Sequence, residues 1–220
     1  ESCIMFTSPN IFETKANNAC VELASISSRH LIFVQDDMVI TERGWNERLV
    51  RPIQAWSDVF AVTARTTHDW RINSYSHDLL HPKDESRVTD WCDILRHENH
   101  VEKVNALRTH FYIRGSVNRG PLAVRADLFR SLGGFDEIYA PLQFDEHDLM
   151  FRARREGYFC GYYAIDWYSE PAWGGTRNAD GSTRQFMYAA DHKNSRIFFG
   201  RWEEELRDLK FQEPQSRYLP

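Results

Sequence analysis

The sequence predicts an α/β protein in which a mixed, mainly parallel sheet is flanked by helices. Short apolar runs of strand length alternate with longer segments of helical periodicity, as in residues 30–34, 45–56 and 59–63. Strands that alternate with helices in this way usually form a mainly parallel sheet. The run 30–34 also ends abruptly at Gln35-Asp36-Asp37, which is typical of a strand whose carboxyl end faces a ligand.

The remaining elements follow from the same patterns. Apolar runs bounded by turn-forming residues predict strands at 3–7, 30–34, 59–63, 111–113, 121–124 and 158–164. Apolar residues at helical spacing predict helices at 13–27, 45–56, 126–132, 146–156 and 184–209. The polar segment 65–105 and residues 170–183 read as loops, with one helix in the first of them near 90–97. The histidines of that segment lack the spacing of a zinc site.

Size and charge exclude several classes of protein. The chain has 220 residues, the length of one large domain, and a net charge of −5, which argues against a nucleic-acid partner. No stretch approaches the roughly 18 apolar residues of a membrane span. Its 4 cysteines are scattered without a CxxC pair, which favours a reduced, cytoplasmic setting.

Asp36 and Asp37 form the first acidic cluster. Two adjacent carboxylates repel each other unless a cation or hydrogen bonds compensate them. Mg²⁺ or Mn²⁺ on a diphosphate needs few protein ligands, because phosphates and waters supply the rest, so one or two Asp residues at a strand end suffice. The alternative is an Asp that caps the turn after the strand.

The second acidic cluster is Asp145-Glu146-His147-Asp148, at the start of the predicted helix 146–156. The helix dipole favours acidic residues there, so these residues could simply cap the helix. They could instead present carboxylates to a pocket, since Asp145 and Asp148 share one face. A carboxylate so placed could take the proton from an acceptor hydroxyl.

Together these features resemble the inverting glycosyltransferases of family 2, which have the GT-A fold, a Rossmann-like α/β arrangement. Three stretches of this sequence carry the resemblance and cover most of the chain outside the polar middle. The first contains Asn18, Gln35-Asp36-Asp37 and Gly44-Trp45. The second, highly specific, contains Gly120-Pro121, Gly133-Gly-Phe-Asp-Glu137, Asp145-Glu-His-Asp-Leu149, Arg152 and Gly157-Tyr158. The third, weaker, is the aromatic-rich segment from Asn194 to Trp202.

The resemblance implies a transferase that moves a sugar from a nucleoside-diphosphate donor to a hydroxyl of a glycan or polysaccharide acceptor, with inversion. Asp37, with Asp36 beside it, would hold Mn²⁺ or Mg²⁺. Glu146 or Asp145 would be the catalytic base, the order of the two being reversed from the family's usual Glu-Asp. The implied donor-binding residues are Asn10, Lys15, Asn18, Gly120 and Pro121. The implied acceptor-binding residues are Asp148, Trp167 and Trp173.

Two departures from the family pattern keep other readings open. Only residues 3–10 precede the matching helix, where members usually have a strand-helix-strand unit for the nucleotide, and no His follows the last core strand. A sugar-binding or scaffolding module of the same fold without activity is therefore the alternative. A nucleotidyltransferase is a third reading, but Ser8-Pro9-Asn10 is not the Gly-rich, basic phosphate loop that it should have.

Overall fold

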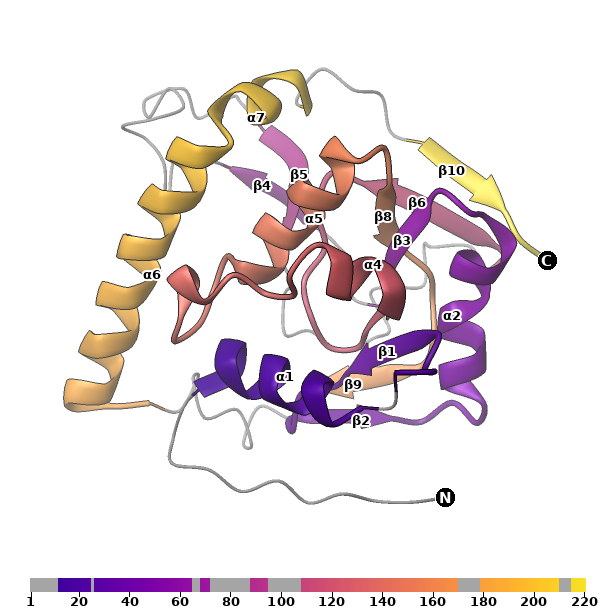
Figure 1. Cartoon of the computed structure of the whole chain (residues 1–220), viewed down its shortest axis with the longest axis horizontal. Coiled ribbons are helices and arrows are strands. Elements are labelled where there is room, and N and C mark those ends of the chain that lie inside the picture. Colours follow the sequence, from indigo (N-terminus) through magenta and orange to yellow (C-terminus); the bar gives the residue numbers. More distant parts are fainter. Residues whose placement is uncertain are drawn as a thin grey trace.

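A six-stranded sheet runs through the centre of the protein (Figure 1). The structure is a computed structural model that describes residues 12–24, 26–64, 68–71, 88–94, 108–169, 179–209 and 215–220. Across the sheet, the strands follow the order β1 (His30–Phe33), β7 (Leu122–Arg125), β3 (Val59–Thr63), β8 (Phe159–Tyr162), β6 (His110–Arg114) and β10 (Gln215–Tyr218).

The sheet is mixed but mainly antiparallel, so the prediction of a mainly parallel sheet was wrong. Only β3 and β8 pair in parallel, and every other neighbouring pair is antiparallel. β1 and β3 do run in the same direction, as their helical connection predicts. They are not neighbours, however, because β7 inserts between them from a later part of the chain and runs against both. Sequence periodicity identifies strands but does not say which strands become neighbours.

Helices and two small sheets surround this centre (Figure 1). The helices are α1 (Phe12–Leu23), α2 (Trp45–Ala55), α4 (Ala126–Ser131), α5 (Asp145–Arg155), α6 (Gly181–Arg201) and α7 (Glu203–Leu209), with a 3₁₀ helix at Glu137–Tyr139. The small sheets pair β2 (Met38–Ile40) with β9 (Trp167–Ser169), and β4 (His68–Arg71) with β5 (Val88–Ile94). Among the described helices, none combines the length and the apolar character that crossing a bilayer requires.

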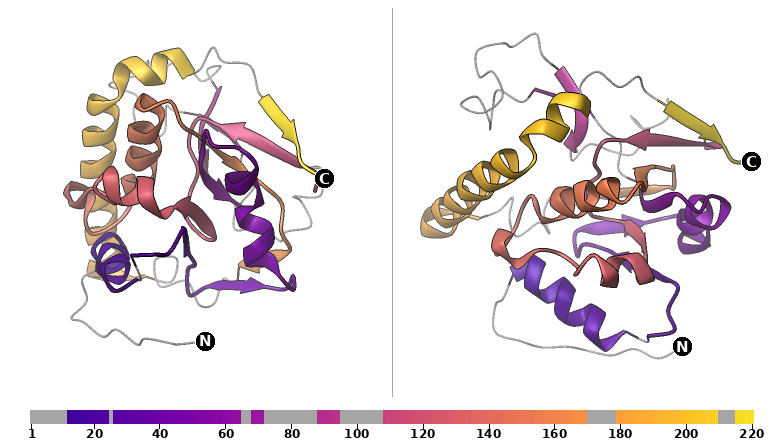
Figure 2. Two further views of the ribbon diagram at one scale, coloured as in Figure 1. Left: turned by 45° about the vertical axis from the view of Figure 1, so that its right-hand side comes forward. Right: turned by 45° about the horizontal axis from the view of Figure 1, so that its top comes forward.

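Both faces of the central strands β7 and β3 are buried. Alternate residues of a strand point to opposite faces, and accordingly Leu122 and Val124 join one hydrophobic cluster while Ala123 joins another. The first cluster also includes residues of α1, α4 and α5, and the second includes residues of α2, β2 and β9. Figure 2 shows these helices on either side of the sheet.

A third hydrophobic cluster packs α6 and α7 against α5 (Figure 2). It is almost wholly aromatic: Tyr139, Phe144, Phe151, Phe198, Phe199, Trp202 and Leu206. Ring pairs such as Phe151 with Phe198, whose centroids lie 5.3 Å apart edge to face, are the arrangement that aromatic quadrupoles favour. The cluster fixes α5, whose first turn carries the second acidic group of residues.

Most predicted elements are confirmed, with shifted ends, and three differences are instructive. Of the helix predicted near 90–97, residues 90–94 are described, and they belong to strand β5 (Val88–Ile94), whose Val, Thr, Trp and Ile residues favour strands. The helix predicted at 184–209 divides at Trp202 into α6 and α7. The chain end, unassigned from the sequence, forms β10. The predicted strand 3–7 lies outside the described residues.

Gly161 in β8 offers a test of this packing. A Cβ there would lie 2.2 Å from the carbonyl oxygen of Tyr112 and 2.7 Å from the ring of Phe111, and the strand backbone cannot retract. We expect Gly161→Ala to lower the free energy of unfolding by about 3 kcal/mol or more, the upper end of overpacking costs. Denaturant unfolding measures this.

Gly200 in α6 is the matched control. A Cβ there meets no atom within 4 Å. Gly200→Ala should therefore leave stability unchanged or raise it by up to about 1 kcal/mol, because alanine favours helices. Equal effects of the two substitutions would contradict the packing described for β8.

Candidate active site

Asp36 and Asp37 occupy the middle of a tight turn that joins β1 to β2. The turn is closed by a hydrogen bond from the Met38 amide to the Gln35 carbonyl, 3.3 Å long. Asp37 is buried and Asp36 is exposed, so the two carboxylates differ in their surroundings. The pair therefore lies where the sequence predicts, directly beyond the end of β1, with Asp37 directed into the protein.

Gly120 packs directly against this turn. Its φ of +82° is one that glycine adopts readily, and a Cβ would lie 2.6 Å from the Oε1 atom of Gln35 and 2.7 Å from the Sδ atom of Met38. Pro121 is buried beside it, and its carbonyl accepts a hydrogen bond from the Thr63 hydroxyl at 3.2 Å. Close packing at Gly120 and burial of Pro121 thus give both residues a structural role, in addition to the donor contact that the resemblance implies.

The second acidic cluster forms the first turn of α5. Asp145, Glu146, His147 and Asp148 are all buried. Acidic residues are stabilised there by the helix dipole, yet burial of this many ionisable groups is costly unless each has partners. The partners of these side chains therefore decide what each of them can do.

Arg119 is the principal partner of Asp145. Its guanidinium, 3 % exposed, donates two hydrogen bonds to the two oxygens of the Asp145 carboxylate, at 2.8 and 3.0 Å. A longer bond of 3.3 Å reaches the Oε2 atom of Glu146. The guanidinium carbon also lies 4.9 Å from the centre of the Phe135 ring, a cation–π distance. Asp145 is thus held at both oxygens, whereas Glu146 is held by Arg119 at one.

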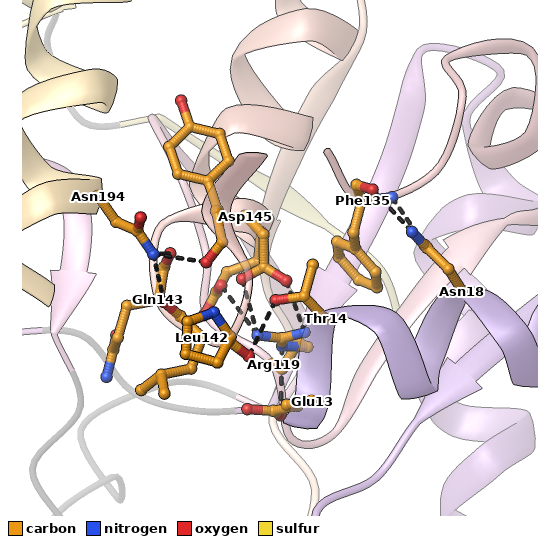
Figure 3. A network of polar contacts seen from close by, with 12 residues as sticks. Glu13, Thr14, Asn18, Arg119, Phe135, Leu142, Gln143, Asp145 and Asn194 are labelled. Atoms are coloured by element: carbon orange, nitrogen blue, oxygen red, sulfur yellow. Dashed lines mark hydrogen bonds and ion pairs between the residues drawn. The ribbon is translucent and has the colours of Figure 1, made fainter. Parts of the chain in front are cut away.

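Glu13 connects the two acidic clusters, and Figure 3 shows it beside Arg119, the partner of Asp145. Its Oε1 atom lies 3.4 Å from the Nε atom of Arg119 and accepts a hydrogen bond of 3.1 Å from the side-chain amide of Gln35. Gln35 immediately precedes Asp36 in the turn. A continuous set of polar contacts therefore runs from the Asp36–Asp37 turn, through α1, to the first turn of α5.

Burial and charge shift several pKa values in this network. Burial raises the pKa of Asp145 to about 7; the guanidinium of Arg119 opposes the rise, and Glu146 adds to it. Burial alone would lower the pKa of Arg119, but the charges of Asp145, Glu13 and Glu146 raise it well above its usual value. Arg119 is therefore a permanent cation. The bidentate contact, in which both oxygens of Asp145 accept N–H groups, stabilises the charged form of this carboxyl and so opposes the effect of burial.

Asp148 belongs to a separate network. Its carboxylate accepts hydrogen bonds from its own helix, from the 3₁₀ helix and from the end of α6: Arg152, Tyr139, Arg201 and Trp202. It is completely buried. Contacts on both oxygens favour a role in orienting α5 over the acceptor contact that the resemblance implies.

Asn194 of α6 holds the loop that leads into α5 (Figure 3). Its side-chain amide donates to the carbonyls of Tyr139 and Leu142, the latter at 2.7 Å. The loop ends with Gln143 and Phe144, both in the left-handed region at φ +71° and +70°. Such a conformation costs a non-glycine residue about 1–2 kcal/mol and persists only where the surroundings enforce it. Asn194 helps to enforce it immediately before Asp145.

The other predicted site residues are placed as follows. Lys15 of α1 is half-exposed and forms an ion pair with Glu137 at 3.9 Å. Asn18 bonds both the amide and the carbonyl of Phe135, at 3.0 and 2.8 Å. Trp167 is buried in the core and donates to the carbonyl of Ala64. Asn10 and Trp173 lie outside the described residues. Asn18 and Trp167 thus have structural partners, and the network round Arg119 contains neither of them nor Lys15.

Arg119 and Glu13 were not identified from the sequence, and Gln35 and Asn194 were named only within the stretches that carry the family resemblance. Arg119 directly precedes the Gly120-Pro121 motif, so a cation next to a motif in an acidic chain was the available signal. The contacts of Glu13 and Asn194 could not be predicted from the sequence, because a polar residue in a helix is usually solvated. Their partners come from segments more than 20 positions away along the chain.

Comparison with known proteins adds no assignment to this geometry. No known protein family matches the chain, and no curated protein resembles it significantly. Within the described ranges, His, Cys, Asp and Glu side chains form no group of three or more that could hold a metal ion.

His147 offers a test of the burial of this turn. Its Nδ1 atom lies 2.7 Å from the Ser116 hydroxyl, and burial lowers its pKa from 6.5 to about 4. As the pH falls below 6.5, the unfolded chain binds a proton that the folded protein does not. The stability due to neutral His147 is therefore complete above pH 6.5 and is lost as the pH falls toward 4.

His147→Gln removes this titration. Lowering the pH from 7 to 4.5 should cost the wild type about 2 kcal/mol of unfolding free energy that the variant does not lose. The difference in unfolding free energy, variant minus wild type, should therefore rise by that amount. Denaturant titrations of both proteins at the two pH values measure the change. A difference that stays constant with pH would show that His147 is accessible to protons in the folded state.

Proposed function

We propose that this protein is a glycosyltransferase that moves a sugar from a nucleoside-diphosphate donor to a hydroxyl acceptor with inversion. The observation that carries the proposal is the connection between the two acidic clusters through Gln35, Glu13 and Arg119. One cluster has the carboxylate oxygens that a diphosphate-bound cation needs, and the other has a carboxylate suited to be a base. A transferase needs both at one place.

Asp37 is the residue that would hold the cation. It offers hard oxygen ligands, which suit Mg²⁺ or Mn²⁺, and a cation carried by a diphosphate needs only one or two protein carboxylates. Asp36, exposed beside it, would contact the cation's hydration shell. When bound, the cation would neutralise charge on the leaving diphosphate.

Glu146 fits the role of base better than Asp145. Asp145 is completely buried and both of its oxygens accept hydrogen bonds from Arg119, so neither oxygen is placed to receive the proton of an acceptor hydroxyl. Glu146 receives only one, longer, bond from Arg119. In the proposed step, Glu146 takes the proton of the acceptor hydroxyl. The acceptor oxygen bonds to the anomeric carbon as the bond to the diphosphate oxygen breaks.

Donor binding tests the proposal first. UDP, GDP, ADP and CDP, with their common sugar conjugates, would be titrated calorimetrically with Mn²⁺ and with a chelator. We expect one base series to bind with Mn²⁺ and to bind at least tenfold more weakly with chelator. Asp37→Asn should weaken Mn²⁺-dependent binding by a similar factor, because the amide has lost the charge that attracts the cation.

Turnover then separates a transferase from a binding module of the same fold. Glu146→Gln should bind the donor within about twofold of wild type but release nucleoside diphosphate from the nucleotide sugar at least 100-fold more slowly. Asp127→Asn, which alters an exposed ion pair with Arg125, is the matched control and should change neither quantity. Binding without any turnover in the wild type would favour the sugar-binding module. Absence of binding to any nucleotide would contradict both.

A further inference from the structure

We propose that Arg119, held in place by Glu13, is the positioning residue that presents Glu146 to the acceptor and keeps Asp145 out of the chemistry. The inference rests on the proposed function and extends it, since it explains how one of two adjacent carboxylates is selected as base. It concerns residues on four segments: α1, the β1–β2 turn, the segment before β7, and α5.

All three nitrogens of the Arg119 guanidinium have carboxylate partners, an arrangement that depends on its planar, branched shape. Its two terminal nitrogens bind Asp145 in parallel, and one of them also reaches Glu146. Its third nitrogen faces Glu13. A planar guanidinium meets such a set of partners with one rigid group, whereas a lysine ammonium is a point charge that cannot form the same pair.

Electrostatics explain why the cation is needed. Three carboxylates, from Glu13, Asp145 and Glu146, surround one guanidinium, and Asp145 is completely buried. Adjacent buried carboxylates repel each other, and without a cation one of them takes up a proton. The charge of Arg119 opposes this effect at Asp145, where burial nevertheless raises the pKa of the carboxyl. Arg119 engages Asp145 at both oxygens and leaves Glu146 with the weaker contact.

Glu13 and Gly120 determine where Arg119 lies. The Oε1 atom of Glu13 contacts both Arg119 and Gln35, so one carboxylate oxygen spans the gap between the two acidic clusters. On the other side of Arg119, Gly120 lies so close to the Gln35 and Met38 side chains that a Cβ would not fit. The distance between the Asp36–Asp37 turn and Glu146 is therefore set through Arg119.

Arg119→Lys tests the inference, because it keeps the charge and removes the branched guanidinium. With Mn²⁺ and the nucleotide sugar that binds best, we expect kcat for nucleoside-diphosphate release to fall 10- to 100-fold. The donor KM and the Mn²⁺-dependent Kd of the nucleoside diphosphate should stay within about twofold. Glu13→Gln, at the more exposed end of the network, keeps an acceptor oxygen for Gln35 but loses its charge, and should lower kcat 3- to 10-fold.

Arg217→Lys is the matched control. Arg217 forms an equally close bidentate pair with Asp58 on the surface, with both contacts at 2.7 Å, and should give wild-type kinetics. A kcat within twofold of wild type in Arg119→Lys would overturn the inference. So would a loss of donor affinity in step with a loss of thermal stability, which is the signature of a purely structural residue.

A crystal structure of Arg119→Lys supplies a readout that does not depend on activity. The inference predicts that the Glu146 carboxylate shifts relative to the Asp36–Asp37 turn, and an unmoved Glu146 would contradict it. If Arg119→Lys does not fold, the structure and kinetics of Glu13→Gln decide in the same way. A wild-type protein that releases no nucleoside diphosphate would reject the proposed function, while the position of Glu146 in the variant would still test the positioning role.

Discussion

The buried ion pair between Arg119 and Asp145 is the interaction on which the arrangement of the site depends. Asp145 is completely buried and Arg119 nearly so, and removal of either partner would leave an uncompensated charge in the interior. Such a loss typically costs about 3–5 kcal/mol. A pair of this kind adds little to net stability compared with a hydrophobic core, so its presence at the start of α5 is better explained by what it orients.

The first turn of α5 can hold three buried acidic residues because two separate hydrogen-bond networks supply their partners. Arg119 serves the side of Asp145 and Glu146, while Arg152, Arg201 and the indole of Trp202 serve Asp148. Phe198 and Phe199 of α6 and Trp202 after it belong to the aromatic cluster that buries Asp148, and burial strengthens its hydrogen bonds. Asp148 therefore fixes α5, and Asn194 fixes the loop before it. The contacts of Arg119 are made to residues of this fixed helix.

The sequence predicted local features well and long-range pairings poorly. The strands within 30–34 and 59–63 and the acidic start of α5 follow from periodicity and capping, which are local properties. The insertion of β7 between β1 and β3 does not, because it depends on which hydrophobic faces meet after some 60 intervening residues. Asp37 and Glu146 could be named as candidate site residues because each stands in a local acidic motif. The Glu13–Arg119 contact, which links them, could not.

The central claim, that Asp37 meets the cation while Glu146 stays available as a base, is tested most directly by anomalous diffraction from crystals grown with Mn²⁺ and the nucleoside diphosphate that binds best. The account predicts a manganese peak at the carboxylate of Asp37, with Arg119 still paired to both oxygens of Asp145. A peak between Asp145 and Glu146 that displaces Arg119, or no peak at Asp37 in a nucleotide-bound crystal, would contradict it.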